Sequence, residues 1–245
     1  MPELPPSDLA APPPAGTPVP RAIAALAEHH PVELVWQNAV GGITARIDRP
    51  GGSVFAKWNP AGSIESLVAE AERMRWLALA ASGGSGAVPV PRVLDLLADA
   101  SGELLITAAI DGASIVSAEG RRDPERAATA LGEGLRRLHA LPTADCPFPA
   151  PDWTPSAATA AEQRDLVVCH GDPCAPNTLI HDGAFAGLVD LARVGVGDRW
   201  SDLAVAAWSL EWNGLDEGEP AFWAAYGIEP DPARISQWRA RWVAG

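Results

Sequence analysis

The feature that most limits the fold of this 245-residue chain is a change in the spacing of its apolar residues near residue 110. Before that point, short runs of strand-forming residues lie between turns rich in glycine and proline. After it, apolar residues recur at the 3.6-residue spacing of helices. A chain of this length can form one large domain or two small lobes. The change of pattern favours two lobes, residues 21–110 and residues 111–245.

The first lobe contains five strand-like runs and one segment with helical spacing. Three runs form a meander, the helical segment follows and ends at Gly83-Gly84, and two more runs flank a turn at residues 100–102. We therefore predict a five-stranded antiparallel sheet with one helix. The predicted strands are 33–37, 43–47, 53–58, 92–97 and 103–108, and the predicted helix is 63–81.

The second lobe has mainly helical spacing, interrupted by a proline-rich stretch and a short apolar strand. Helices are predicted for residues 124–141, 201–212 and 219–226, and a strand for residues 166–169. Residues 1–20 are dominated by proline and alanine, a composition that cannot repay the entropy of ordering. We expect them to be a flexible leader outside the fold.

Charge and cysteine content exclude several classes of protein. The formal net charge of -13 repels nucleic acid and attracts polycations, although acidic surfaces also serve solubility alone. No run of eighteen apolar residues is available to span a membrane. The three cysteines lack paired metal spacing and no secretory signal is visible, which indicates a reducing compartment. We expect a cytoplasmic protein, monomeric or weakly dimeric, that binds neither nucleic acid nor membrane.

The most specific motif lies between residues 166 and 190, where His170-Gly171-Asp172 is followed by Asn177 and Asp190. Phosphoryl transfer needs a carboxylate near the attacking hydroxyl and oxygen ligands for Mg²⁺. A loop that leaves a buried strand and a hairpin that follows it supply such groups here. A surface loop rich in turn formers is the alternative, but it would not require apolar strands on both sides.

A second candidate pair lies upstream, where Lys57 ends an apolar strand and Glu70 follows thirteen residues later in the predicted helix. In kinase-type folds such a pair holds ATP phosphates. Lys57 alone would be read as an ordinary lysine on an edge strand. Glu65 and Glu72 compete for the role, and we favour Glu70 from its position along the helix.

Together these segments resemble the bacterial aminoglycoside phosphotransferases. The resemblance rests on LVVCHGDPCAPNTLIHDGAFAGLVDLARVGVGDRWSDLAVA, VFAKW, AEAERMRWLA and ELLITAAIDGAS, and covers roughly residues 33 to 238. It implies a bilobal protein-kinase-like fold of the α+β class, with ATP and Mg²⁺ as cofactors and a cationic antibiotic as the small-molecule partner. The implied activity is phosphorylation of an aminoglycoside hydroxyl, which confers antibiotic resistance.

The resemblance also implies a role for each matching residue. Asp172 is the expected catalytic base, Asn177 and Asp190 the Mg²⁺ ligands, and Lys57 with Glu70 the pair that orients ATP. Adenine would meet the backbone of Thr107 to Ala109, and the loop 38–44, with Gly41, Gly42 and Thr44, would cover the phosphates. In the same family pattern, Asp198 would brace the catalytic loop, Asp202 would cap or orient the next helix, and His170 would pack beneath the loop.

Substrate identity is the least determined expectation. A polyamine drug needs carboxylates to pair its ammonium groups, and we favour Glu211 and Asp152 over Asp216, Glu217 and Glu219. The resemblance favours the 3'-hydroxyl of kanamycin- or neomycin-type drugs. Streptomycin, another small hydroxyl compound, and a decayed kinase that binds without transferring are alternatives. Only residues 149–165 bridge a gap that holds a longer helical segment in relatives.

Overall fold

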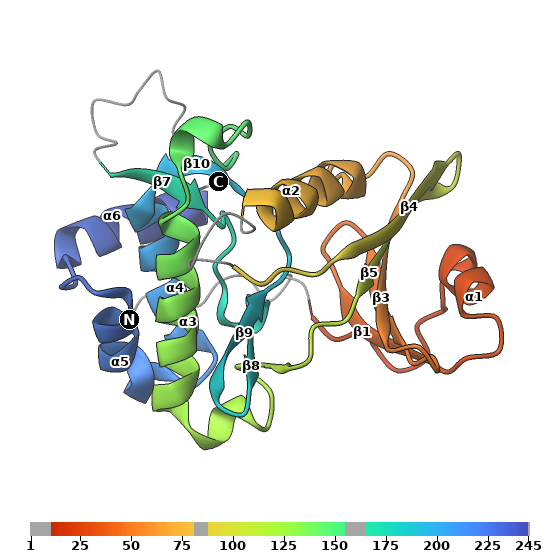
Figure 1. Ribbon diagram of the computed structural model, residues 1–245, viewed down its shortest axis with the longest axis horizontal. Coiled ribbons are helices and arrows are strands. Elements are labelled where there is room, and N and C mark those ends of the chain that lie inside the picture. The colour runs from red at the N-terminus through yellow and green to blue at the C-terminus, as the bar shows by residue number, and fades with distance from the viewer. Residues whose placement is uncertain (1–10, 81–87, 155–164, 245) are drawn as a thin grey trace. The chain divides into compact units, whose positions relative to one another are not determined.

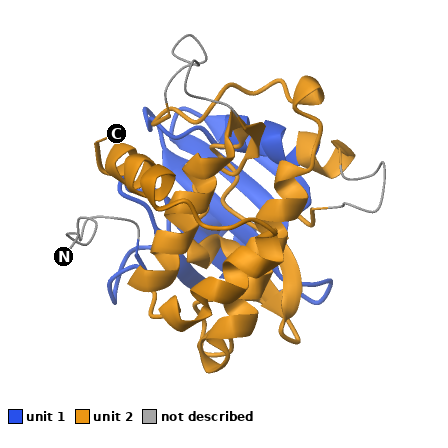
Figure 2. Cartoon of the chain, turned by 90° about the vertical axis from the view of Figure 1, so that its left-hand side faces the viewer, with its two compact units in different colours: residues 1–75, 91–109 blue, residues 76–90, 110–245 orange. Residues whose placement is uncertain are grey.

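The computed structural model describes residues 11–80, 88–154 and 165–244 (Figure 1). The chain divides into two compact units, each built from two stretches of sequence (Figure 2). Unit 1 comprises Met1–Arg75 and Pro91–Ala109, and unit 2 comprises Trp76–Val90 and Ile110–Gly245. Among the described residues, no helix has the length and apolar character needed to cross a membrane.

Unit 1 is built on a five-stranded antiparallel sheet in the order β1-β2-β3-β5-β4 (Figure 1). Burial alternates along β2, where Ile43, Ala45 and Ile47 face the core, as the period-two pattern requires. The predicted five-stranded sheet is therefore confirmed. Its strands are β1 Val32–Gln37, β2 Ile43–Ile47, β3 Val54–Pro60, β4 Val93–Asp99 and β5 Gly102–Ala108.

Two features of unit 1 were not expected from the sequence. Helix α1, Arg21–Ala27, buries Ile23 and Ala27 in the core beneath the sheet, in addition to the one predicted helix. Ala11 exchanges backbone hydrogen bonds of 2.9 and 3.0 Å with Gln37 of β1. Part of the segment 1–20 is thus attached to the sheet, which corrects the expectation that all of it lies outside the fold.

The expected helix after β3 is α2, Leu67–Ala80, and its first turn is capped from a distant strand. The Glu103 carboxylate on β5 accepts hydrogen bonds from the backbone N–H groups of Leu67, at 2.5 Å, and Val68, at 3.3 Å. A negative charge at this end satisfies orphan donors and complements the helix dipole. The cap fixes the start of α2 against β5 within unit 1.

Unit 2 is mainly helical, as predicted, with two small antiparallel sheets of order β10-β7 and β6-β8-β9. Helix α3 packs against both α5 and the β8–β9 hairpin, and α4 packs against α6 (Figure 1). The α+β class is therefore confirmed. The helices are α3 Pro124–His139, α4 Arg199–Trp212, α5 Glu219–Tyr226 and α6 Pro232–Ala244; the strands are β6 Ala113–Ser114, β7 Leu166–Cys169, β8 Thr178–His181, β9 Ala184–Leu188 and β10 Gly195–Asp198.

The core of unit 2 centres on α4, which is buried from Trp200 to Leu210. A helix that is buried on all sides must be surrounded by other elements. Trp208 is 3% exposed, and its ring centroid lies 4.4 Å from that of Trp212. The expectation that these two tryptophans pack the helix is confirmed. The central position of α4 lets its few polar side chains reach the loop described next.

Candidate active site

The loop that carries the His170-Gly171-Asp172 motif leaves the buried strand β7 through a glycine in a left-handed conformation. Gly171 has φ +81°, and a Cβ atom there would lie 2.3 Å from the backbone oxygen of Arg193. Both the backbone angle and the close approach exclude larger residues. The tight turn places Asp172 directly after the strand end.

A carboxylate from α4 anchors this turn. Asp202, fully buried, accepts hydrogen bonds from the backbone N–H groups of His170, at 2.6 Å, and Gly171, at 3.0 Å. Asp198 instead caps the start of α4 by accepting from the Trp200 N–H at 2.9 Å. The expected roles are thus exchanged: Asp202 braces the loop and Asp198 caps the helix. Both lie in GDRWSDLA, and the spacing alone did not tell which one faces the loop.

His170 holds the loop from beneath and is buried, as expected. Its Nε2 lies 3.1 Å from the Val189 carbonyl, which can only accept, so Nε2 carries the proton. The Nδ1 atom is then the acceptor for the Asp172 backbone N–H at 3.3 Å. His170 therefore joins the loop to the segment that leads into Asp190, and it has a structural task rather than that of a base.

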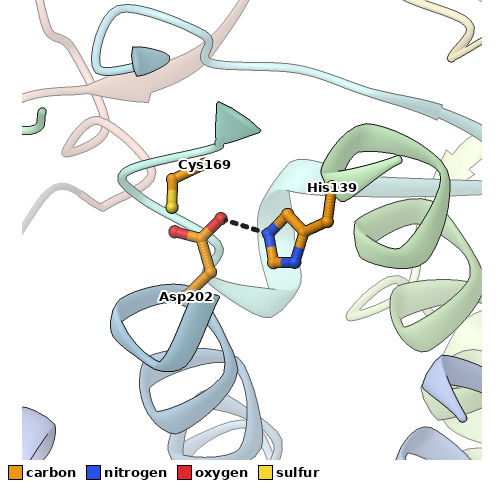
Figure 3. Close-up of side chains that lie close together, drawn as sticks. All are labelled: His139, Cys169 and Asp202. Carbon is orange, nitrogen blue, oxygen red and sulfur yellow. Dashed lines mark hydrogen bonds and ion pairs between the residues drawn. The ribbon is translucent and has the colours of Figure 1, made fainter. Parts of the chain in front are cut away.

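Asp202 is itself held by a buried histidine of α3 (Figure 3). His139 Nε2 lies 3.0 Å from Asp202 Oδ2, so it donates, and Nδ1 then accepts from the Tyr226 hydroxyl at 2.8 Å. Burial raises the pKa of Tyr226 to about 12. The Cys169 thiol lies beside this pair, and burial first, then the Asp202 charge, raises its pKa well above the ordinary value. The cluster is a hydrogen-bonded brace in which both carboxylate oxygens of Asp202 are already used.

The three residues expected to surround the metal come from connected segments. The Asn177 side-chain amide donates to the Asp172 carbonyl at 3.0 Å, which leaves its Oδ1 as an oxygen ligand. The Asn177 carbonyl accepts from the Val189 N–H at 2.9 Å, next to Asp190. Asp190 follows β9 with φ +59°, a left-handed conformation that is uncommon outside glycine. Such strained residues cluster at functional sites.

The Asp172 carboxyl has the environment of a reactive acid. Its Oδ1 is buried and, among the described residues, has no hydrogen-bond partner. Burial raises the pKa of Asp172, and the Asp190 charge raises it further, while the Cys174 thiol, His170 and Arg193 act in the opposite direction. Mg²⁺ prefers carboxylate and amide oxygens. A buried carboxylate oxygen without a donor, next to a second carboxylate and an amide, fits a site of this kind.

Unit 1 brings the upstream pair together. Lys57 Nζ on β3 lies 2.9 and 3.2 Å from the two carboxylate oxygens of Glu70 on α2. Glu70 is 1% exposed. Of the competing acids, Glu65 accepts a hydrogen bond from the Asn38 side chain at 2.7 Å, and Glu72 is exposed. The choice of Glu70 as the partner of Lys57 is confirmed in this geometry, and its role toward ATP stays a prediction.

The expected nucleotide loop is the turn between β1 and β2. Gly41 has φ +83°, and the Gly42 N–H donates to Asn38 Oδ1 at 2.5 Å. A Cβ at Gly42 would lie 2.0 Å from Asn59 Oδ1, so the amide cluster requires glycine there. Thr44 pairs with Lys57 across the β2–β3 ladder. The loop is thus tied to the strand that carries the lysine.

The expected adenine contacts lie at the end of β5. Thr107 is buried and pairs with Phe55 and Val93 in the sheet. The Ala109 N–H donates to the Ser53 carbonyl at 3.0 Å, so that donor is used within unit 1. Adenine recognition by the backbone of Thr107 and Ala109 stays a prediction. At Ala109, the backbone carbonyl is the group that would contact adenine.

The two expected substrate acids both lie near arginines. Asp152 is exposed, and its Oδ1 lies 3.8 Å from Arg193 Nε. Glu211 on α4 is exposed. Burial lowers the pKa of Arg239, and the charges of Glu219 and then Glu211 oppose this shift, so Glu211 lies near that arginine. Both carboxylates are open to solvent, and each lies near the positive charge of an arginine. Their role toward a drug stays a prediction.

Three residues that contact the loop were not among the site residues predicted from the sequence. The Trp153 indole N–H donates to the Gly171 carbonyl at 2.8 Å, and Ser209 Oγ accepts from the Ala175 N–H at 2.8 Å. The Cys174 thiol lies against Asp172, and burial raises its pKa well above the ordinary value. Cys174 stands inside the motif and was open to notice. Trp153 and Ser209 act on backbone atoms, for which no sequence pattern exists.

The chain was compared with known protein families and with solved structures. The model of the phosphotransferase enzyme family matches residues 44–166 and 152–238. The chain belongs to this family. Both candidate segments, Lys57 with Glu70 and the motif from His170 to Asp190, fall within the matched residues, so the chain is a phosphotransferase and the expected resemblance is confirmed.

Named relatives have two related activities. The chain is 32% identical to the streptomycin 3''-kinase of Streptomyces griseus over 74% of this chain and 80% of that protein. It is 33% identical to the aminoglycoside 3'-phosphotransferase of Streptomyces fradiae over 68% of this chain and 72% of that protein. Identity is thus nearly equal for the two kinds of enzyme.

Solved structures show the same fold. An aminoglycoside 3'-phosphotransferase of type VIII matches with a TM-score of 0.74 and 28% identity, covering 91% of this chain and 96% of that one. An aminoglycoside phosphotransferase of Streptomyces rimosus, in complex with ADP and streptomycin, matches with a TM-score of 0.67 and 28% identity, covering 90% and 95%. The predicted protein-kinase-like fold of the aminoglycoside phosphotransferases is therefore confirmed.

Proposed function

We propose that this phosphotransferase is an ATP- and Mg²⁺-dependent kinase that phosphorylates a hydroxyl of an aminoglycoside antibiotic and thereby confers resistance. The observation that carries the proposal is the buried Oδ1 of Asp172, which has no hydrogen-bond partner among the described residues and lies beside Asn177 and Asp190. Such a carboxylate is poised to receive a hydroxyl group. The solved relative that binds ADP and streptomycin supports both the nucleotide and the class of acceptor.

Each residue would have one task in an in-line transfer. Asp172 orients the drug hydroxyl and accepts its proton as the oxygen attacks the γ-phosphorus of ATP, and the bond to the β-phosphate oxygen breaks to release ADP. Asn177 and Asp190 would hold Mg²⁺, which neutralises charge on the phosphates. Glu70 would keep the Lys57 ammonium turned toward the phosphates, as its short contact favours. No covalent intermediate on the protein is required.

We favour the 3'-hydroxyl of kanamycin- or neomycin-type drugs, with the 3''-hydroxyl of streptomycin as the second candidate. The second is supported by the relative from Streptomyces griseus, which is as similar to this chain as the 3'-phosphotransferases are. Glu211 and Asp152 would pair ammonium groups of either drug. We also expect the enzyme to act in the cytoplasm, as a monomer or weak dimer.

The acceptor is tested by ADP release with kanamycin, neomycin, streptomycin, hygromycin and choline. Mass spectrometry and NMR of the product then identify the phosphorylated hydroxyl. Turnover with kanamycin or neomycin alone supports the first choice, and turnover with streptomycin alone supports the second. Drug binding without ADP release from any acceptor would contradict the kinase proposal and indicate a decayed enzyme.

The role of Asp172 is tested in the same assay. Asp172→Ala is expected to lower kcat about 100- to 10,000-fold because the hydroxyl loses its proton acceptor, while ATP binding by calorimetry is retained. The control is Asp95→Ala, which removes an exposed aspartate of β4 and is expected to keep full activity. Retained turnover in Asp172→Ala would refute the assignment.

A further inference from the structure

A tryptophan outside the two candidate segments, Lys57 with Glu70 and the motif from His170 to Asp190, is in contact with the loop that carries Asp172. The Trp153 indole N–H donates to the Gly171 carbonyl at 2.8 Å, and the two residues are eighteen positions apart. An indole has a single donor and no acceptor, so this bond fixes the ring in one orientation. Trp153 thus contacts the residue immediately before Asp172.

The contact completes the fixation of one peptide group. Asp202 holds the N–H groups of His170 and Gly171. The next peptide group, between Gly171 and Asp172, has its N–H held by His170 Nδ1 and its carbonyl held by Trp153. A peptide group is planar and ends at the Cα atom of Asp172. Any rotation of this plane therefore swings the Asp172 side chain.

The C-terminal helix holds the Trp153 ring from the other side. Trp242 on α6 meets it edge to face, with ring centroids 4.9 Å apart at 82°, and Trp238 does so at 6.1 Å and 89°. Edge-to-face contacts are the favoured arrangement of aromatic rings. Trp238 is 3% exposed and belongs to the core of unit 2, so α6 is packed in place where it meets the Trp153 ring.

We propose that Trp153 is a positioning residue that transmits the placement of helix α6 to the Asp172 carboxylate through the Gly171 carbonyl. The inference rests on the proposed function only in giving Asp172 its catalytic role. It adds a task for α6, which is far from the motif in sequence, and for Trp153, which lies outside both candidate segments. Loss of the indole N–H frees the peptide plane while the aromatic packing persists.

The test is Trp153→Phe, which keeps an aromatic ring and removes the donor. We expect kcat to fall roughly 2- to 10-fold, the effect of one lost hydrogen bond expressed in the rate, with the KM for ATP unchanged. The matched control is Trp223→Phe on α5, whose indole N–H donates to Glu219 at 3.0 Å, remote from the loop in sequence. The control is expected to lower thermal stability without lowering kcat.

A second measurement does not depend on activity. In Trp153→Phe, hydrogen exchange of the backbone amides of residues 170–172 is expected to accelerate relative to the wild type, because the loop opens more often. Trp223→Phe is expected to leave these three amides unchanged. If no acceptor is phosphorylated in any variant, the proposed function fails while the exchange rates still decide whether Trp153 positions the loop.

A milder variant guards against loss of folding. Trp242→Ala removes the closer edge contact and leaves the Trp153 donor in place. It is expected to shift kcat and the same amide exchange rates in the same direction as Trp153→Phe, by a smaller factor. Equal kcat values in Trp153→Phe and Trp223→Phe, or unchanged exchange at residues 170–172 in both Trp153→Phe and Trp242→Ala, would overturn the proposal.

Discussion

Glu70 keeps a carboxylate almost completely out of water, and such a group persists only when it is paired. Its partner is the Lys57 ammonium, which is itself 19% exposed at the side chain. Desolvation costs each ion several kcal/mol, so a pair of this kind is weak support for stability alone. Its presence at this place in unit 1 is better explained by the need to hold the ammonium end of Lys57 in one position.

Glu70→Gln tests this explanation. We expect kcat/KM for ATP to fall about 10- to 100-fold, because a charge-assisted hydrogen bond worth about 1.5–3 kcal/mol no longer orients Lys57. Glu72→Gln, an exposed acid two positions along the same helix, is the control and is expected to behave as the wild type. Similar losses in both variants would show that helix charge, and not the pair, matters.

Asp172 is expected to lower stability as well as to serve catalysis. Its folded-state pKa is raised, so between its ordinary pKa and the raised one the folded protein holds a proton that the unfolded chain releases. The free energy of unfolding therefore decreases as pH rises through this window. Above this window the folded protein bears a charge at Asp172 that burial and the Asp190 charge both disfavour.

Asp172→Asn is therefore expected to have a higher Tm than the wild type at about pH 7.5 without Mg²⁺, and the gain is expected to shrink toward about pH 5. Calorimetry at the two pH values measures this difference. Asp48→Asn is the control of opposite sign, because hydrogen bonds from Ser53 and Arg46 hold the pKa of Asp48 below its ordinary value. A lower Tm for Asp172→Asn at neutral pH would contradict the inferred strain.

At the scale of elements, unit 2 depends on how closely α3 approaches α5. Gly132 lies where a Cβ atom would be 2.4 Å from the Phe222 carbonyl oxygen and 3.1 Å from the Tyr226 backbone nitrogen. The glycine lets the two helices pack at backbone distance. It also places Tyr226 where its hydroxyl reaches His139.

Gly132→Ala is expected to lower the free energy of unfolding by about 1–3 kcal/mol, because the added methyl group overpacks the contact between the helices. Thr129→Ala, at an exposed site on the same helix, is the control and is expected to be neutral or slightly stabilising. Chemical denaturation with urea measures both. A more stable Gly132→Ala would show that helix propensity outweighs the close approach.

The sequence predicted the elements whose pattern is strong and missed those stabilised mainly by tertiary contacts. The strand 43–47 and the helix starting at Pro124 were predicted correctly because alternation and a proline at the first helical turn mark them. Strand β10, GVGD, contains two glycines and forms only because β7 pairs with it. Helix α6 was missed although Ile235, Trp238 and Trp242 already have helical spacing.

The site shows the same division. Lys57, Glu70 and the motif around Asp172 were predicted because their residue types are chemically distinctive. The exchange of roles between Asp198 and Asp202 was not, because two aspartates four positions apart differ only in which one faces the loop. The packing of α4 determines which aspartate faces the loop, and the order of residues in the sequence does not show it.

At the scale of the whole molecule, the formal charge of -13 affects encounter with ligands. An acidic protein attracts a polycation and repels an anion over a distance limited by the Debye length, about 10 Å at 0.1 M salt. Drug and nucleotide should therefore respond to ionic strength in opposite ways. The drug loses attraction as salt is added, and ATP loses repulsion.

We expect kcat/KM for a polycationic drug to fall as NaCl rises from about 10 to about 200 mM, while kcat/KM for ATP stays level or rises. Steady-state rates at several salt concentrations measure both slopes. ATP is the internal control, because a general loss of activity in salt would lower both values together. Parallel slopes would show that net charge does not guide the drug.

The division of the chain between its units has a practical consequence for protein engineers. The polypeptide passes from one unit to the other after Arg75, after Val90 and after Ala109. One cut therefore never yields two intact halves: a fragment ending at Arg75 lacks β4 and β5, and with them the Glu103 carboxylate that caps α2. A split enzyme for reporter assays needs a permuted or re-linked gene, because a simple truncation at Arg75 would discard two of the five strands of the sheet.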